Sequence, residues 1–325
     1  MATFAKKTFN TSVYAVSRPT YPKALFDYIF AYHSAGVPAN VKTLTLEKPR
    51  LPSPRWNSAV DLGCGTGQAT TELAQFKHVV GVDPSENMLA GAKAHVLEKL
   101  GQDSQSMSQF TFHQSSAENL SFLEDQSVDL TIAAQACHWF DWSKIWPEVA
   151  RVTRPGGTAA FWVYSEFRLS KYPSLAPLIT EYSQGSDPLK SLGPHWQQPG
   201  RSILDNHLVA VPEPPSELGF ADMHRVYFTG GYYPNLPRPF VFPVILRSKT
   251  TWGGLMGYLR TFSSLHTFLE RNPKDSENAE GDVAERFWKS LMQAAAKHDG
   301  KSAYKPDDEV AIEWPVAMLL VKKLK

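Results

Sequence analysis

Residues 59–67 read AVDLGCGTG, an apolar run that ends in an acidic residue and is followed by three glycines at alternate positions. This pattern is typical of a β-strand that passes through a tight turn into a helix, predicted here over residues 68–76. Glycine has no Cβ, so the turn can adopt positive φ and let a ligand lie against bare backbone. The first amides of the helix would point at that ligand. The stretch therefore predicts a small-molecule site at a βα turn.

A second apolar run, HVVGV over residues 78–82, ends at Asp83, twenty residues after Gly63. A carboxylate at this strand tip is placed to accept hydrogen bonds from two ribose hydroxyls. Gln68 stands where the dinucleotide fingerprint has its third glycine. The missing glycine and the negative charge of Asp61 argue against a pyrophosphate and favour a ligand with an ammonium group. We predict S-adenosylmethionine, a nucleoside that carries an amino acid; the alternative is a tight turn that binds nothing.

Composition and charge narrow the class of protein. The chain has 325 residues and is 42% hydrophobic, which suits one large domain or one domain with an insertion. Lys plus Arg number 33 against 32 Asp plus Glu, so we expect no nucleic-acid partner. No apolar run approaches the ~20 residues that span a bilayer, and the first residues lack a signal-peptide core. With only two cysteines, Cys64 and Cys137, we expect a reducing, cytoplasmic location and no membrane partner.

Strands are predicted over residues 58–62, 78–82, 110–113, 128–134 and 158–164, with helices between them. Ser85 and Asp141 are predicted N-caps of two of these helices, and residues 154–157 (RPGG) a helix stop. Apolar strands that alternate with helices predict a parallel sheet covered on both faces.

The regular alternation of strands and helices weakens beyond residue 164. We expect the whole chain to consist of four parts. Residues 1–57 are assigned to an N-terminal lid helix (23–32) and a loop, 58–164 to the cofactor-binding core, 165–239 to an insertion over the acceptor pocket, and 240–325 to the completion of the sheet and C-terminal helices. Within the last part we expect a strand over 240–247, a helix over 252–268, a helix capped by Asp282 and a last strand over 309–322.

The glycine turn and four further stretches resemble one protein family. Residues 9–22, 137–141, 193–201 and 258–263 are similar to the fungal trans-aconitate methyltransferase group, within the class I S-adenosylmethionine-dependent methyltransferases with a methyltransferase type 11 domain. The resemblance covers nearly the whole chain. It departs from the family in a longer loop at 35–56 and in Phe262, where relatives usually carry Trp, and both departures would reshape the acceptor pocket.

The resemblance implies an α/β fold: a Rossmann-like, mostly parallel seven-stranded sheet, with helices on both faces and strands 6 and 7 as an antiparallel pair at one edge. It implies glycines against the methionine part of the cofactor, an acid near its ammonium through water or backbone, an acid on the ribose, and residues after strand 3 at the adenine. The implied cofactor residues are Asp61, Gly63, Cys64, Gly65, Gly67, Asp83, Pro84, Met88, Ala117, Glu118 and Gln135. Met88 could instead belong to the core, and Glu118 could simply be exposed.

The family also implies methylation of a small molecule, with the acceptor a carboxylate. In-line displacement needs a nucleophile about 3 Å from the methyl group. A carboxylate is already ionised at neutral pH, so positioning cations suffice and no base is needed. The implied catalytic residues are His138, Tyr21 and Arg18, and the implied acceptor residues are Tyr14, Trp139, Tyr164, His195, Trp196, Arg201 and Arg260. No metal is expected.

Several alternatives stay open from the sequence. His138 either orients the acceptor or acts as a base in O- or N-methylation of a secondary metabolite. Either arginine of the insertion and C-terminal part, Arg201 or Arg260, could instead form a surface salt bridge. The chain could also bind S-adenosylmethionine without catalysis. We expect a monomer or weak dimer.

Overall fold

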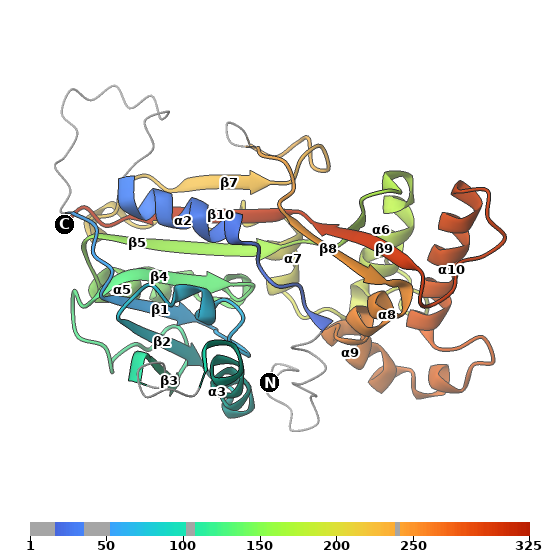
Figure 1. The fold of residues 1–325 in the computed structure, drawn as a ribbon, viewed down its shortest axis with the longest axis horizontal. Coiled ribbons are helices and arrows are strands. Elements are labelled where there is room, and N and C mark those ends of the chain that lie inside the picture. Colours follow the sequence, from blue (N-terminus) through green and yellow to red (C-terminus); the bar gives the residue numbers. More distant parts are fainter. Residues whose placement is uncertain (1–16, 36–52, 102–107, 238–240) are drawn as a thin grey trace.

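Two sheets lie along the length of the molecule. The structure is a computed structural model that describes residues 17–35, 53–101, 108–237 and 241–325. A seven-stranded sheet has the order β3-β2-β1-β4-β5-β10-β7, and a three-stranded sheet has the order β6-β9-β8. Figure 1 shows the large sheet at one end, and the small sheet with helices α6, α8, α9 and α10 at the other.

The large sheet is parallel up to β5 and antiparallel at one edge. Its strands are β1 Ser58–Leu62, β2 His78–Asp83, β3 Phe110–Gln114, β4 Val128–Ala134, β5 Thr153–Tyr164, β7 His224–Phe228 and β10 Val316–Lys322. β1 pairs in parallel with β2 and β4, whereas β10 pairs antiparallel with both β5 and β7. The predicted fold is confirmed, and the carboxyl ends of β1, β2 and β4 meet at one edge of the sheet.

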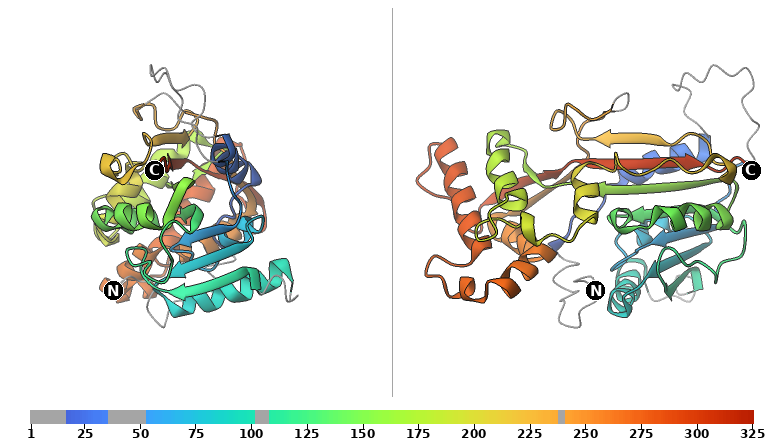
Figure 2. Two further views of the ribbon diagram at one scale, coloured as in Figure 1. Left: turned by 90° about the vertical axis from the view of Figure 1, so that its left-hand side faces the viewer. Right: turned by 180° about the vertical axis from the view of Figure 1, so that it is seen from behind.

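Helices cover both faces because strand side chains alternate in direction. Along β5, Ala160 and Trp162 enter one apolar core, and Phe161 and Val163 enter the other. The first core also holds α2 (Lys23–Ala35), and the second holds α5 (Trp142–Val152). Figure 2 shows these helices on opposite faces. Each large apolar side chain buried in this way contributes about 1.5–3 kcal/mol.

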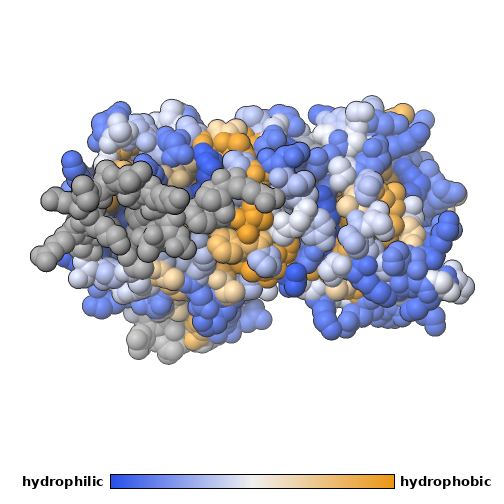
Figure 3. All heavy atoms as spheres, turned by 90° about the horizontal axis from the view of Figure 1, so that it is seen from above, coloured by the Kyte–Doolittle hydropathy of each residue, from blue (hydrophilic) through white to orange (hydrophobic). Residues whose placement is uncertain are grey.

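The remaining helices are α3 (Glu86–Leu100), α6 (Ala176–Gln184), α7 (Gly200–Asp205), α8 (Trp252–Arg260), α9 (Ser263–Arg271) and α10 (Val283–His298). The predicted N-caps are confirmed. Ser85, Asp141 and Asp282 each accept backbone hydrogen bonds at the first turn of α3, α5 and α10. The molecular surface seen from above is mostly hydrophilic, with an apolar area near its middle (Figure 3).

The small sheet was not predicted. Its strands are β6 Arg168–Leu169, β8 Leu246–Thr251 and β9 Glu309–Trp314. The expected strand over 240–247 is wrong, because the sixth strand of the large sheet is β7, within the segment assigned to the insertion. The expected single strand over 309–322 is two strands, β9 and β10, interrupted at Pro315. Proline has no N–H to donate to a ladder, so the strand leaves one sheet and enters the other at this point.

Three further boundaries differ from expectation. The helix predicted over 68–76 is only a short 3-10 turn, Thr70–Leu73. The helix predicted over 252–268 is two helices, because Phe262 adopts an extended conformation between α8 and α9. The RPGG stretch predicted as a helix stop lies inside β5.

Candidate active site

The glycine turn follows β1 and lies at the carboxyl edge of the sheet. Gly63, Gly65 and Gly67 all have positive φ, at 68°, 54° and 85°. A Cβ on Gly63 would lie 2.5 Å from the Cβ of Ala136, so only glycine fits there. A Cβ on Gly65 would meet nothing within 4 Å, which means that this residue faces open space.

Asp83 ties the turn to the start of α3. Its Oδ2 accepts a hydrogen bond from the Gly65 amide at 3.0 Å, and its Oδ1 accepts one from the Ser85 amide at 2.9 Å. Burial raises the pKa of Asp83, and the two amides oppose that shift. Each carboxylate oxygen keeps a second lone pair, so this acid can also accept from a ribose diol.

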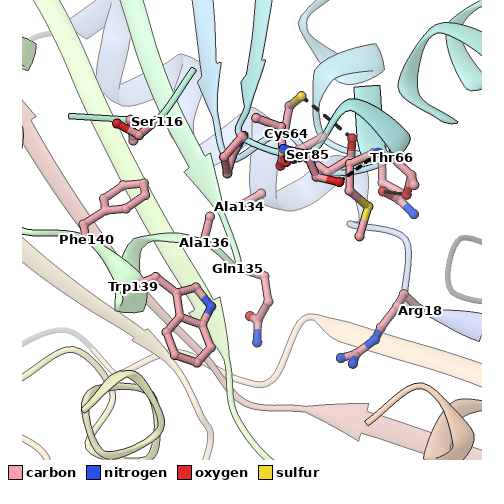
Figure 4. A pocket seen from close by; sticks show the side chains of 18 of the residues that line it. Arg18, Cys64, Thr66, Ser85, Ser116, Ala134, Gln135, Ala136, Trp139 and Phe140 are labelled. Atoms are coloured by element: carbon pink, nitrogen blue, oxygen red, sulfur yellow. Dashed lines mark hydrogen bonds between the residues drawn. The ribbon is translucent and has the colours of Figure 1, made fainter. Parts of the chain in front are cut away.

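A cavity of about 290 Å³ opens in front of the turn (Figure 4). The predicted residues that line it are Gly63, Cys64, Gly65, Asp83, Pro84, Met88, Ala117, Glu118 and Gln135. In Figure 4, Arg18, Gln135 and Trp139 lie along one side of the cavity, and Cys64, Thr66 and Ser85 lie along the opposite side. The cavity is large enough for an elongated ligand whose ends lie at Gln135 and at Ala117.

Two predicted cofactor residues lie behind the turn and do not line the cavity. Gly67 packs against Ala92, and a Cβ there would lie 3.2 Å from it. Asp61 is fully buried, and its Oδ2 accepts a hydrogen bond from Thr70 Oγ1 at 2.7 Å. Burial, with a smaller contribution from Asp83, raises the pKa of Asp61 to about 7. Any effect of Asp61 on a ligand ammonium therefore passes through the backbone of the turn.

Several lining residues were missed from the sequence. They are Thr66, Gln68, Ala69, Ser116, Ala134 and Phe140. Ser85 was predicted only as a helix cap, although its position two residues after Asp83 was a usable signal. Phe140 carried no signal, because its place follows from the 3-10 turn Cys137–Trp139 that ends β4.

A smaller cavity of about 90 Å³ adjoins the first. Arg18, Gln135, Trp139 and Tyr164 line both cavities, so they form a shared wall. The small cavity is otherwise lined by His138, Ser165, Glu166, Phe167, Ser183, Trp196, Arg201, Leu204, Tyr258, Phe262 and Ser263. These residues come from the segments that follow β4 and β5 and from the helices α6, α7, α8 and α9, which brings the C-terminal part of the chain against the carboxyl edge of β4 and β5.

Arg18 joins the N-terminal segment to this wall. It donates to the Tyr164 hydroxyl at 3.0 Å and to the Thr261 carbonyl at 3.1 Å, both neutral oxygens. Its guanidinium also lies 5.4 Å from the ring centroid of Tyr258 and 5.8 Å from that of Phe262. These contacts hold the guanidinium of Arg18 at the shared wall.

Gln135 fixes the ends of β4 and β5 to one another. It adopts φ of 56°, a left-handed conformation that is uncommon for a residue with a Cβ. Its side-chain amide accepts from the Tyr164 amide at 2.6 Å and donates to the Tyr164 carbonyl at 3.1 Å. This pair of bonds places Tyr164, and hence Arg18, relative to the larger cavity.

His138 is buried beside two cations. Its ring packs against Trp139, and its Nδ1 has no hydrogen-bond partner among the described residues. Burial, together with Arg201 and Arg18, lowers the pKa of His138 to about 3. The imidazole is therefore neutral at physiological pH and a weak base.

Glu166 is the carboxylate of the small cavity, and all its acceptor positions are occupied. Its Oε1 accepts from Arg168 at 2.5 Å and Thr180 at 2.6 Å. Its Oε2 accepts from Ser183 and, at 3.1 Å, from Gln184. A carboxylate has about four lone-pair sites, so Glu166 holds α6 in place and has no capacity left to act as a base.

Two predicted acceptor residues lie away from both cavities. Arg260 forms ion pairs with Asp282 and, at 3.0 Å, with Glu285, which is the salt-bridge alternative. His195 pairs through Nε2 with the Pro188 carbonyl at 2.9 Å and packs on Phe268.

Tyr21 lines the larger cavity, where its ring packs edge-on against Trp162, and it does not line the small cavity. Tyr14 and most of the loop at 35–56 lie outside the described residues. In the described part of the chain, no group of three or more His, Cys, Asp or Glu side chains is placed to hold a metal ion. Nor does any described helix combine the length and apolarity needed to cross a membrane.

Comparison with known proteins agrees with this architecture. Residues 60–161 match the family described as a methyltransferase domain. A probable S-adenosylmethionine-dependent methyltransferase of Saccharomyces cerevisiae is 29% identical over 205 residues, covering 63% of this chain and 61% of that protein. An uncharacterized methyltransferase of Mycobacterium tuberculosis is 31% identical over 179 residues, covering 54% of this chain and 58% of that protein. The chain thus spans about three fifths of the length of these relatives.

A solved structure described as a type II methyltransferase from Anaeromyxobacter dehalogenans superimposes with a TM-score of 0.61 at 24% identity, covering 94% of this chain and 98% of that one. This likeness concerns the fold. The matched domain contains the glycine turn, Asp83 and Gln135, the residues that border the larger cavity. The part of the chain that builds most of the larger cavity is therefore similar to S-adenosylmethionine-dependent methyltransferases.

Proposed function

We propose that this protein methylates a carboxylate of a small acid. When bound, S-adenosylmethionine supplies an electrophilic methyl group. The observation that carries the proposal is the wall shared by the two cavities, which brings the cofactor side and the acceptor side into contact at Arg18, Gln135, Trp139 and Tyr164.

Charge favours an anionic acceptor in the small cavity. Arg18 and Arg201 both line it, and the single carboxylate there, Glu166, is saturated by donors that include the cation Arg168. Arg18 lies at the shared wall, so it is placed to orient the reacting carboxylate. Arg201 lines only the small cavity and not the larger one, so it is placed to bind the end of the acceptor that does not react.

The absence of an available base among the described lining residues also favours a carboxylate. His138 is neutral with a pKa of about 3, and Glu166 has no free acceptor position. A phenol or an ammonium must lose a proton before it attacks, whereas a carboxylate is already ionised. His138 then orients the acceptor, and Trp139, Trp196 and Phe262 limit the access of water.

The test is transfer of a labelled methyl group to a panel of acceptors. The panel contains succinate, citrate, trans-aconitate, a simple phenol and a primary amine. We expect label on an acid, and we expect mild base to release it, because methyl esters hydrolyse. Base-stable label on the phenol or the amine would contradict the proposal. Cofactor binding without transfer to any acid would identify a non-catalytic binding protein.

A further inference from the structure

Asp205 contacts the arginine that we assign to the acceptor. It is the last residue of α7 and lies four residues after Arg201. Its Oδ2 accepts a hydrogen bond from Arg201 Nε at 2.7 Å, and the two side chains are 21% and 10% exposed. A guanidinium is a planar fork, so a bond at Nε leaves the edge formed by Nη1 and Nη2 for a second anion.

The face of the same guanidinium is also fixed. Arg201 lies over the ring of Trp196, with 4.0 Å between the guanidinium carbon and the ring centroid. Trp196 in turn packs against Phe262, with ring centroids 5.5 Å apart. Asp205 thus holds one edge of the guanidinium, and Trp196 covers one of its faces. Together these two contacts fix the plane of the guanidinium.

The backbone that carries Asp205 is held firmly in place. His207 and Leu208, which follow α7, both adopt left-handed conformations, with φ of 53° and 60°. The Leu208 amide donates to the Ile203 carbonyl at 3.0 Å, and Arg225 donates to the Leu208 carbonyl at 2.7 Å. The end of α7 is therefore a rigid support for the carboxylate.

The remaining edge of Arg201 is incompletely paired. Its Nη2 is buried and has no hydrogen-bond partner among the described residues, although the residue lines the small cavity. A buried charged donor without a partner is unfavourable, so an acceptor anion would gain affinity by pairing with it.

We propose that Asp205 is a positioning residue, which holds the Arg201 fork so that its terminal nitrogens meet the non-reacting end of the acceptor. This inference rests on the proposed function. A positioning role and a simple charge effect predict changes of opposite sign in the affinity for the acceptor. Removing the negative charge of Asp205 would by itself strengthen the attraction for an anion, whereas losing the orientation of Arg201 would weaken binding.

Two substitutions separate these effects. Asp205→Ala removes both the charge and the hydrogen-bond acceptor, and we expect the acceptor KM to rise about tenfold with kcat changed less than twofold. Asp205→Asn keeps an oxygen for Arg201 Nε, and we expect the KM to equal or fall below that of the wild type. The acceptor in these assays is the acid of the panel that the wild-type protein methylates fastest. S-adenosylmethionine is present at a saturating concentration.

The matched control is Asp275→Ala. Asp275 pairs with Arg286 at 2.8 Å, has a side chain 13% exposed, and lines neither cavity. This variant should lose stability without a change in acceptor KM. If Asp205→Ala does not fold, Asp205→Ser, whose hydroxyl is too short to reach Nε, replaces it.

The proposal is overturned if both Asp205 variants keep the wild-type KM, if both lower it, or if both raise it equally. A readout without substrate is the Nε–H proton signal of Arg201, identified from its loss in Arg201→Lys. It should keep slow exchange with water in Asp205→Asn and lose it in Asp205→Ala. If no acid is methylated by the wild-type protein, the proposed function fails, and this signal still decides the role of Asp205.

Discussion

The two adjoining cavities at the carboxyl edge of the large sheet are built in different ways. The larger one is made mostly by the segments at the carboxyl ends of β1, β2, β3 and β4, within the matched residues 60–161, and is completed by Arg18, Pro19, Tyr21 and Tyr164. The smaller one gathers side chains from Arg18 to Ser263, carried by the segments after β4 and β5 and by several short helices. A cofactor common to a whole family can be bound by a local backbone motif, whereas an acceptor pocket is assembled from distant segments that can vary independently.

The largest effect should come from the cofactor side. Asp83→Ala removes the acceptor of the Gly65 and Ser85 amides and, with it, the predicted ribose partner. Hydrogen bonds to a charged group contribute about 1.5–3 kcal/mol each, so we expect S-adenosylmethionine affinity to fall about a hundredfold or more. Isothermal titration calorimetry measures it, with Arg201→Ala as the control that keeps wild-type cofactor affinity. A loss below about threefold would contradict the assignment of Asp83.

The next effect separates two arginines that look alike in the sequence. Arg201→Ala removes a cation that lines the acceptor cavity, and we expect the acceptor KM to rise about thirtyfold. Arg260→Ala removes a cation paired with Asp282 and Glu285 outside both cavities. It should lower the melting temperature and leave the acceptor KM unchanged. If both substitutions changed the acceptor KM equally, the distinction between an acceptor-binding Arg201 and a structural Arg260 would be wrong.

A smaller effect is expected at His138. His138→Gln should lower kcat less than about tenfold, because the imidazole is not a base, and general base catalysis contributes about 10²–10⁴-fold. At saturating cofactor, the wild-type kcat should be flat from pH 6 to pH 8. The pKa of His138 is lowered to about 3, so its neutral form persists over that range. Initial rates across that range test this, and a bell-shaped profile or a thousandfold loss would restore the base-dependent alternative.

The smallest effect concerns Asp61 and the stability of the free protein. Its folded pKa is raised to about 7, so the folded state favours the protonated acid. Stability is therefore greatest below the unfolded pKa of about 4 and decreases as pH rises toward 7. Asp61→Asn should raise the free energy of unfolding at pH 8 and change it little at pH 4.

Thermal melts without cofactor at the two pH values measure the Asp61 effect. Asp27→Asn is the control, because Asp27 is an exposed acid in a surface ion pair with Lys23. It should change the melting temperature little at either pH. A pH-independent difference between wild type and Asp61→Asn would show that Asp61 is not titrating in this range.

Local physics explains what could be predicted from the sequence. The strand, the three glycines and Asp83 were identified because each is required by the backbone at its own position. Caps such as Asp282 were identified for the same reason, since they satisfy amides two or three residues away.

Tertiary contacts explain what could not be predicted. Glycine is needed at position 200 because a Cβ there would lie 2.4 Å from the Trp139 ring, a contact between residues far apart in the chain. Arg201 and Arg260 differ only in the acids that the fold brings to them and in whether a cavity lies beside them. β7 was not predicted from the sequence; it lies within the segment assigned to the insertion and pairs with β10, which comes about ninety residues later in the chain.

The path of the last strand pair has a consequence for how the molecule is made. β9 is the middle strand of the small sheet, and β10 lies between β5 and β7 in the large one. Both come from residues 309–322, so the ribosome supplies them after every other strand of the two sheets. Until then β5 and β7 have no partner between them, and the nascent chain holds an exposed sheet edge that other chains can pair with. A chain that stops before residue 309 would therefore lack one strand of each sheet.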